Sequence, residues 1–164
     1  MTETRADSFW SFTLAFYGRT GVSGALIALQ DRFGHDVNLL LYACWLGLHD
    51  GVALTTAERA AAAARVEEWR RTVLLPLRSA RRAIKAAALA ETEAIYADAK
   101  SIELAAEQIA QRLIASAAPA ARAGIALDER RRLAAANLDL CLPSADERSL
   151  ATPVRTALAA IVAP

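Results

Sequence analysis

The apolar residues of this chain recur at intervals of three and four positions, which is the spacing of one face of an α-helix. Within residues 56–88, for example, Val66, Trp69, Val73 and Leu77 fall on one stripe. No segment alternates strictly between apolar and polar residues, as a half-buried β-strand does. The pattern therefore predicts an all-α protein, a single-domain bundle of about five to seven helices.

Residues that favour helix ends divide this pattern into segments. Ser, Thr, Asp and Asn cap helix starts, and glycine ends helices in the left-handed conformation. We expect caps at Asp7 or Ser8, Ser23, Asp36, Thr55, Asp128 and Ser144, capping boxes completed by Glu58 and Glu147, and a helix stop at Gly34. The predicted helices are 9–17, 24–33, 37–49, 56–88 and 91–116, then one from 128, one from 144 and one from Pro153 to about 162.

The long segment 56–88 contains Pro76, which removes one backbone donor and clashes with the preceding turn, so we expect a kink or a break just before it. We also expect the first three helices to pack on the long pair 56–88 and 91–116. Residues 1–116 then form the helical bundle core. Residues 117–164 supply a linker and Ala- and Arg-rich helices that pack on the bundle or extend it.

Composition supports the helical interpretation and narrows the classes of partner. About a quarter of the chain is alanine, the strongest helix former. Lys and Arg number 19 against 18 Asp and Glu, a net charge of +1, so bulk charge favours neither a nucleic-acid ligand nor an acidic tail.

We infer the compartment and the state of the cysteines from sequence signals that are missing. The longest apolar stretch, from Val37 to Leu48, is shorter than the roughly 20 residues of a membrane span, so we expect a core helix there and no membrane span. The first ten residues lack the pattern of a secretory signal, and we expect a cytoplasmic protein. Cys44 and Cys141 are far apart without a ligand-spaced partner, so we interpret them as buried, inert thiols.

Three motifs carry a resemblance to a known family. They are F-W-x-F-x-L-x-x-Y from Phe9, L-Q-D-x-x-G-x-D-V-N-L-L-L from Leu29, and W-x-x-x-V-x-x-P-L-R-x-x-R-R from Trp69. A fourth block contains Lys100, Glu103-Leu104 and Ala106-Glu107. Over roughly residues 8–113 the chain resembles an uncharacterised proteobacterial family of small cytoplasmic proteins. The resemblance implies an all-helical fold and supplies no catalytic residue.

Motifs of known chemistry are absent from the sequence. No phosphate-binding glycine loop, zinc-protease helix or serine-hydrolase elbow occurs, so we expect no cofactor and no metal. His35 precedes a helix cap and is expected in solvent, whereas His49 lies at a helix C-terminus, where a cation suits the dipole. Catalysis is uncertain on this evidence, and we lean against it.

One polar cluster lies around the predicted helix 37–49, formed by Gln30, Asp31, Asp36 and Asn38. Its structural interpretation is a helix cap at Asp36, one ion pair from Asp31 to an arginine, and a hydrogen-bonded or solvated Asn38. The alternative is that the cluster binds a small ligand or carries out catalysis together with an arginine.

A basic stripe without acids runs along the long helix, formed by Arg70, Arg71, Arg78, Arg81, Arg82 and Lys85. The next segment is rich in acids. If the chain folds back near Ala88, the two blocks neutralise each other, and we predict that Arg78 and Arg82 face this segment and pair with Glu93, Asp98 or Glu103. Such a stripe could otherwise bind an acidic protein or, less favoured without interleaved aromatic residues, nucleic acid.

The large aromatic residues are expected in the core or in an interface. The first helix carries aromatic residues on all faces, so it is buried or lies in an interface. We predict that Trp10, Trp45, Trp69 and Leu40 are buried in one apolar cluster.

These features favour a non-catalytic interaction or regulatory protein, with a protein partner or a self-copy contacting the first helix or Arg70, Arg71 and Arg81. The alternative is a small-ligand binder or enzyme that uses the polar cluster with an arginine of the stripe.

Overall fold

The computed structural model describes residues 4–87 and 89–162, and within them it contains helices and their connections but no strand, which confirms the predicted all-α class. The predicted limits at residues 1, 88 and 164 lie outside the described residues. The elements are α1 (Arg5–Tyr17), α2 (Val22–Phe33), α3 (Val37–Leu48), α4 (Thr56–Trp69), the π-helical turn η1 (Arg70–Leu74), α5 (Leu75–Ala87), the 3-10 turn η2 (Ala90–Thr92), α6 (Glu93–Ala115), α7 (Leu127–Cys141), α8 (Ala145–Leu150) and α9 (Thr152–Ala159).

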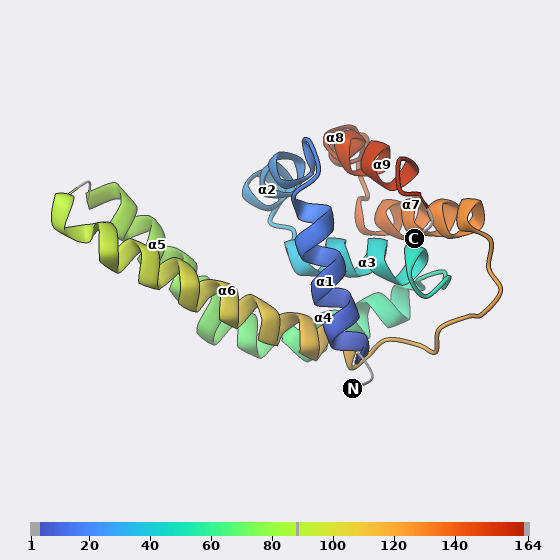
Figure 1. The fold of residues 1–164 in the computed structure, drawn as a ribbon, viewed down its shortest axis with the longest axis horizontal. Coiled ribbons are helices and arrows are strands. Elements are labelled where there is room, and N and C mark those ends of the chain that lie inside the picture. Colours follow the sequence, from blue (N-terminus) through green and yellow to red (C-terminus); the bar gives the residue numbers. More distant parts are fainter. Residues whose placement is uncertain (1–3, 88, 163–164) are drawn as a thin grey trace.

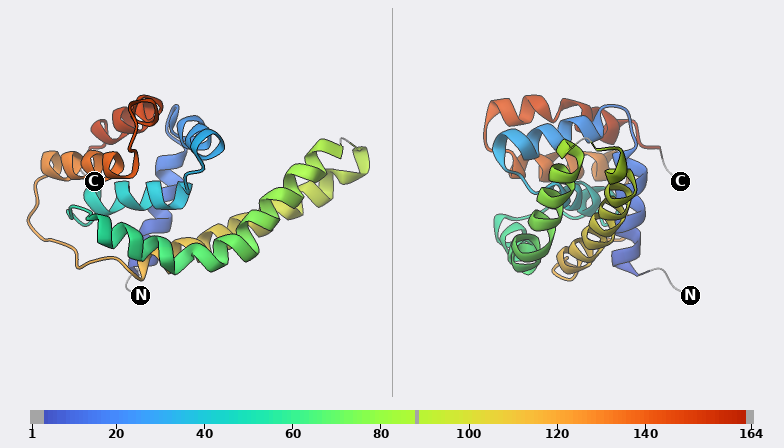
Figure 2. Two further views of the ribbon diagram at one scale, coloured as in Figure 1. Left: turned by 180° about the vertical axis from the view of Figure 1, so that it is seen from behind. Right: turned by 90° about the vertical axis from the view of Figure 1, so that its left-hand side faces the viewer.

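The molecule has a body and a projecting arm (Figure 1). The arm consists of α5, η2 and residues 93–105 of α6, and it extends away from the other helices in Figure 1 and in the left view of Figure 2. No described residue of α5 is buried, and the buried residues of α6 begin at Ala106. The expectation that the first three helices pack on the long pair holds at the inner end of the pair, where α1 and α3 contact α6 and α3 contacts α4. Helix α2 lies mainly against α3, α8 and α9, and the outer end of the pair forms the arm.

Helix α3 forms the centre of the body. Ten of its residues are buried, among them the fully enclosed Trp45. Its backbone lies against α7 so closely that a Cβ atom at Gly47 would collide with the backbone of Ala134. Helix α7 places Leu138, and α9 places Val154 and Leu158, in the same apolar core as α1–α4, so the C-terminal segment contributes to that core.

Several predicted caps are present and three are not. Asp36 accepts a hydrogen bond from the Asn38 backbone at 2.9 Å, Gly34 ends α2 at φ 75°, and both capping boxes form. The first helix begins earlier than predicted, because Thr4 is its cap and Asp7 completes a capping box. Ser23 and Asp128 are not caps: α2 begins after Gly21 and α7 after Ala126.

Pro76 lies directly after a π-helical turn. The Leu75 N–H donates to the Arg70 carbonyl, five residues earlier, and the chain then continues into α5. Proline has no N–H to offer the carbonyl four residues before it, and the wider π turn changes the bonding register just ahead of this gap. The predicted interruption therefore takes the form of η1 and not of a helix end.

The predicted aromatic cluster forms in part. Trp45 and Leu40 are buried, and Trp69 packs half-buried on the core while its indole N–H donates to the Ala106 carbonyl at 3.0 Å. Trp10 is not in the core, because the buried side of α1 is the one that carries Phe9 and Phe16. One face of the aromatic first helix is therefore left outside the core.

Both histidines make defined contacts. His35 does not lie free in solvent as expected, because its Nε2 is 2.8 Å from Glu147 Oε1. His49 is the C-cap of α3, where its ring stacks on Trp45 and its Nδ1 lies 2.9 Å from Asp50 Oδ1. The two cysteines are free and buried, and burial raises the pKa of the Cys141 thiol to about 11.

Candidate functional site

A cleft of about 430 Å³ lies where the arm leaves the body. We call it the elbow cleft. Its sides come from α1 and α2 of the body and from α5 and α6, and α3 contributes to its base. The elements that meet here are far apart in the chain, so the cleft exists only in the folded protein. Its lining residues are Trp10, Thr13, Leu14, Tyr17, Ile27, Gln30, Val37, Asn38, Leu41, Arg78, Arg81, Arg82, Lys100, Glu103, Leu104, Glu107 and Gln111.

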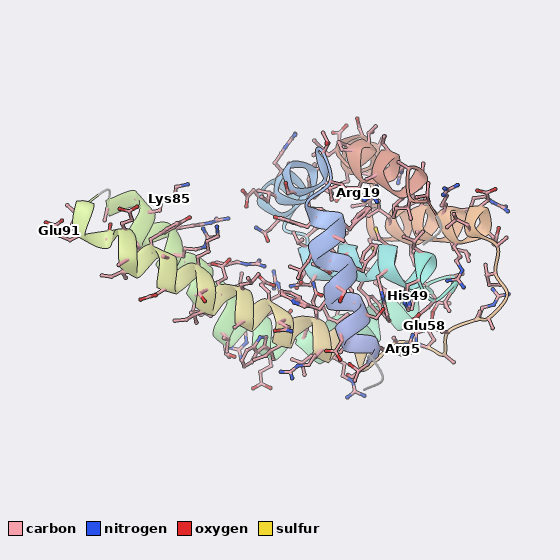
Figure 3. The ribbon with its side chains drawn as sticks, viewed as in Figure 1. Arg5, Arg19, His49, Glu58, Lys85 and Glu91 are labelled. Carbon is pink, nitrogen blue, oxygen red and sulfur yellow. The ribbon has the colours of Figure 1, made fainter. Side chains whose placement is uncertain are left out.

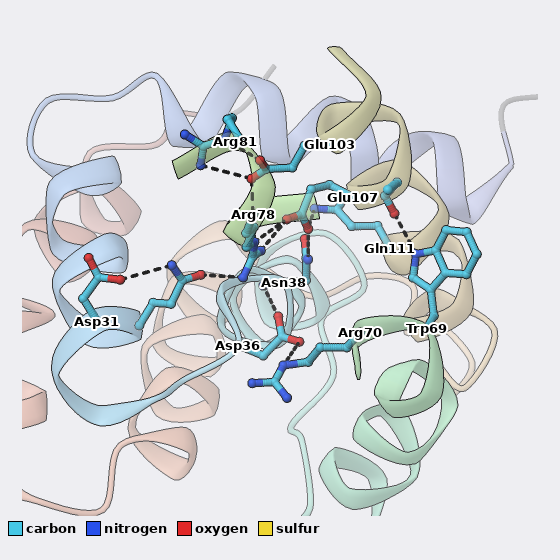
Figure 4. A network of polar contacts seen from close by, with 12 residues as sticks. Asp31, Asp36, Asn38, Trp69, Arg70, Arg78, Arg81, Glu103, Glu107 and Gln111 are labelled. Carbon is cyan, nitrogen blue, oxygen red and sulfur yellow. Dashed lines mark hydrogen bonds and ion pairs between the residues drawn. The ribbon is translucent and has the colours of Figure 1, made fainter. Parts of the chain in front are cut away.

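Arg78 is the centre of a polar network at the base of the elbow cleft (Figure 4). Its Nη1 donates to Gln30 Oε1 at 2.7 Å, and its Nε donates to Glu107 Oε1 at 3.1 Å. Glu103 lies close as well, with its Oε1 3.7 Å from the same Nε. One guanidinium thus joins α2, α5 and α6, and charge-assisted bonds of this kind are stronger than neutral ones.

The network continues inward through a chain of buried amides. Asn38 donates from Nδ2 to Glu107 Oε2, and its Oδ1 accepts from Gln111 Nε2 at 3.0 Å. The Gln111 carbonyl oxygen in turn accepts from the Thr13 hydroxyl at 3.0 Å. Asn38 is only 4% exposed, so these bonds satisfy groups that would otherwise be costly to bury. The chain fixes α3 and α1 against α6.

Two further arginines form ion pairs at the edge of the cleft. Arg81 donates from Nε to Glu103, and this bond raises the pKa of the arginine. Arg82 donates to Asp31 Oδ1 at 3.0 Å, and this bond, with a weaker one from Gln30, lowers the pKa of Asp31. Arg78 thus meets the prediction through Glu103. The predicted ion pair is therefore present, but it comes from Arg78 alone. Arg82 lies one turn further along the same side of α5, where Asp31 of α2 is its partner, while Arg81 takes Glu103 of α6.

The lining of the elbow cleft also includes exposed apolar side chains, which we call its apolar wall. Leu14 on α1 is 54% exposed, Ile27 on α2 is 44% exposed and Leu104 on α6 is 52% exposed. Trp10 and Tyr17 are half-buried lining residues, and desolvation raises the pKa of the Tyr17 hydroxyl. Large apolar residues gathered in a concavity and left uncovered mark binding sites in soluble proteins.

The structure divides the predicted polar cluster between two places. Gln30 and Asn38 line the elbow cleft, whereas Asp36 lines a separate cavity, where its Oδ2 is 3.4 Å from the Nε of Arg70. Two residues apart near a helix start, Asp36 and Asn38 point in different directions. Asp31 stays at the edge through its bond to Arg82.

The predicted basic stripe is divided as well. Arg78, Arg81 and Arg82 line the elbow cleft, whereas Arg70 belongs to the second cavity. Arg71 is exposed and lines neither cavity, and Lys85 lies in the outer part of the arm (Figure 3). Of the three arginines predicted to contact a partner, Arg70 and Arg81 have acidic partners within the protein and Arg71 is exposed, so their contact with a partner stays a prediction.

Residues of α6 were missing from the predicted site. Glu107 and Gln111 complete the network, and Lys100 and Leu104 form the rim and the apolar wall. These four residues and Glu103 are three or four positions apart in the sequence, so they lie on one face of the helix. That spacing was the available signal, because one mixed face of charged, amide and leucine residues is unusual on a solvated helix.

The described residues offer no ready metal site, because no three His, Cys, Asp or Glu side chains among them are grouped to hold an ion. None of the described helices alone is long and apolar enough to cross a bilayer, although α1 and α2, bent by 101° to each other, pass that test as a pair.

The fold and this site define an all-α protein with a mixed apolar and polar cleft at the base of a helical arm. The chain belongs to a family described as "Protein of unknown function (DUF2390)", whose model matches residues 8–114. The matched segment ends in the last turn of α6. It contains all of the lining residues of the elbow cleft. No curated protein and no solved structure matches the chain.

Proposed function

We propose that this chain is a non-catalytic interaction protein of the bacterial cytoplasm, and that the elbow cleft binds an acidic amphipathic segment of a partner protein. The compartment and the bacterial origin are carried over from the sequence as part of this proposal. The observation that carries the binding role is the uncovered apolar wall of the cleft, where Leu14, Ile27 and Leu104 are all more than 40% exposed.

The polar base of the cleft supports a structural role for its charged groups. Arg78 uses all three guanidinium nitrogens, and Asn38 uses both ends of its amide, within the protein itself. A general acid, base or nucleophile needs a group that is free to reach its substrate. The base therefore suits a rigid floor under a bound segment better than a reacting centre.

Charge at the rim selects the kind of segment. The lining contains four cations, Arg78, Arg81, Arg82 and Lys100, against the two carboxylates Glu103 and Glu107. Lys100 forms no ion pair with any described residue, and it adjoins the apolar wall. Complementary potentials steer association and exclude wrong partners. A segment with large apolar residues at helical spacing and flanking Asp or Glu matches both features.

A random peptide library displayed on phage tests the proposal with the intact protein as bait. We expect the enriched sequences to carry two or more large apolar residues at spacings of three or four, flanked by Asp or Glu. A Lys100→Glu variant should lose the acidic preference, whereas the exposed Arg71→Glu variant, which lies outside the cleft, should select the same sequences. Enrichment of basic sequences, or of none, would overturn the proposal.

A small apolar molecule is the second candidate, because about 430 Å³ lies within the range of small-ligand pockets. It would be favoured if no peptide were enriched while a hydrophobic dye bound the wild-type protein and failed to bind a Leu104→Glu variant. Binding of duplex or single-stranded nucleic acid that depended on Arg82 and Lys100 would favour the basic-stripe alternative and contradict both.

A further inference from the structure

A second cavity, of about 250 Å³, lies between the start of α3, helix α4, η1 and the end of α7. It shares no lining residue with the elbow cleft. Its charged lining residues are Asp36, Arg59, Glu67 and Arg70, and His35 and Cys141 also line it. The cavity is large enough for several non-hydrogen atoms, since one water occupies about 30 Å³ in the liquid.

Three side chains of this cavity hold buried polar atoms that form no hydrogen bond in the protein, namely Asp36 Oδ2, Arg59 Nε and Arg70 Nε. Asp36 Oδ2 and Arg70 Nε lie 3.4 Å apart as an ion pair without a hydrogen bond, whereas Arg59 Nε has neither kind of partner. The Asp36 side chain is only 7% exposed, and its other oxygen caps α3. Buried polar atoms without hydrogen bonds are rare in native proteins, and three on the lining residues of one cavity indicate a missing set of contacts.

The charges here are incompletely paired. Arg59 forms no ion pair with any described acid, although part of its guanidinium is buried. Arg70 has Asp36 and the mostly exposed Glu67 beside it, while His35 is held by Glu147. A guanidinium presents a planar fork that matches a carboxylate or a phosphate. Asp36 Oδ2, in contrast, is an acceptor that lies 3.4 Å from Arg70 Nε without a hydrogen bond, so it is able to accept one from a ligand.

The local backbone is also unusual. Arg70 is the first residue of η1, and its carbonyl accepts the bond that closes the π turn. Single π turns inside longer helices occur frequently at functional sites. Here the turn lies where α4 passes towards α5, and it begins at one of the two arginines that face the cavity.

We propose that this cavity binds a small oxyanion that carries its own hydrogen-bond donor. Arg59 and Arg70 contact the anionic oxygens, and Asp36 Oδ2 accepts from the hydroxyl or amino group of the same molecule. Hydroxy acids, amino acids and protonated phosphate groups all have an anionic oxygen and a hydrogen-bond donor in one molecule. The site is independent of the elbow cleft and of any protein partner bound there.

Thermal unfolding in the presence of four probes tests this proposal and separates the two sources. Inorganic phosphate and glycolate carry a donor beside the oxyanion, whereas sulfate and acetate do not. At millimolar concentrations and constant ionic strength, phosphate or glycolate should raise the Tm by at least about 2 °C more than its donor-free counterpart. A response to phosphate alone identifies a phosphate ligand, and a response to glycolate alone identifies a carboxylate. Equal responses within each pair, or none, would show that water or an adventitious ion fills the cavity and would overturn the proposal.

Two variants make the test specific. Asp36→Asn keeps a residue that caps helices well but replaces the acceptor by a donor, so it should reverse the preference towards sulfate or acetate. Arg59→Gln should abolish the response and should leave the Tm without added anion unchanged or higher, because the variant removes an unpaired charge. Arg71→Gln, at an exposed position outside the cavity, is the matched control. If Arg59→Gln kept the full response, or if Asp36→Asn kept the original preference, the assignment would be wrong.

Discussion

Replacement of Asn38 by leucine should destabilise the protein strongly, although asparagine and leucine have similar size. The side chain is 4% exposed and links Glu107 to Gln111. The variant leaves one amide donor of Gln111 and one carboxylate oxygen of Glu107 without partners in a buried place. Each such group costs about 1–3 kcal/mol, so we expect the free energy of unfolding to fall by about 2–6 kcal/mol.

Urea denaturation followed by circular dichroism measures this loss, and the Tm should fall by about 4–24 °C. The Gln108→Leu variant, at an exposed position on α6, is the control and should stay within about 0.5 kcal/mol of the wild type. The double variant Asn38→Leu/Gln111→Leu should lose less unfolding free energy than the two single variants lose together, because the Gln111→Leu change removes one of the groups that Asn38→Leu leaves without a partner. An Asn38→Leu variant as stable as the control would refute the role assigned to the network.

Two further predictions concern packing and pH. Gly47→Ala should lower the free energy of unfolding by about 3 kcal/mol or more, because the new methyl group meets the backbone of α7, whereas Gly24→Ala, in open space on α2, should raise it by up to about 1 kcal/mol; urea titrations compare them. Hydrogen bonds from the backbone and hydroxyl of Ser144 lower the pKa of Glu147 to about 2. Its stabilising effect is therefore complete above the usual value of 4.5 and is lost as the pH falls towards 2, so Glu147→Gln should flatten the pH dependence of stability in that window. A variant with an unchanged acid profile would contradict that assignment.

Local features of the fold could be predicted from the sequence because they depend on neighbouring residues. The all-α class followed from apolar spacing, and the boxes at Thr55 and Ser144 followed from residues three positions apart. The start of the first helix was misplaced because Asp7 suits both the N-cap and the third position of a capping box. In the structure Thr4 is the N-cap and Asp7 occupies the third position. Such errors shift a boundary without changing the element.

Contacts between elements were harder to predict. The acid-rich segment after the basic stripe correctly indicated an ion pair from Arg78 to Glu103, since the two helices form a hairpin. The partner of Arg82 depends on how α2 approaches α5, and nothing local in the sequence specifies that approach. The sequence could have predicted that Asp36 and Asn38 lie in different cavities, because side chains two positions apart on a helix point in different directions. The arm was not predicted, because its apolar spacing resembles that of a buried helix.

The affinity of one enriched peptide for two variants of α6 tests the central claim most directly. Leu104 and Ile102 are 52% and 56% exposed on the same helix, but only Leu104 lines the elbow cleft. Leu104→Glu places a carboxylate in the apolar wall, and we expect it to raise the Kd for the acidic peptide at least about tenfold, which corresponds to about 1.4 kcal/mol. Ile102→Glu should leave the Kd within about twofold of the wild-type value, and equal losses in both variants, or none in either, would contradict binding in the elbow cleft.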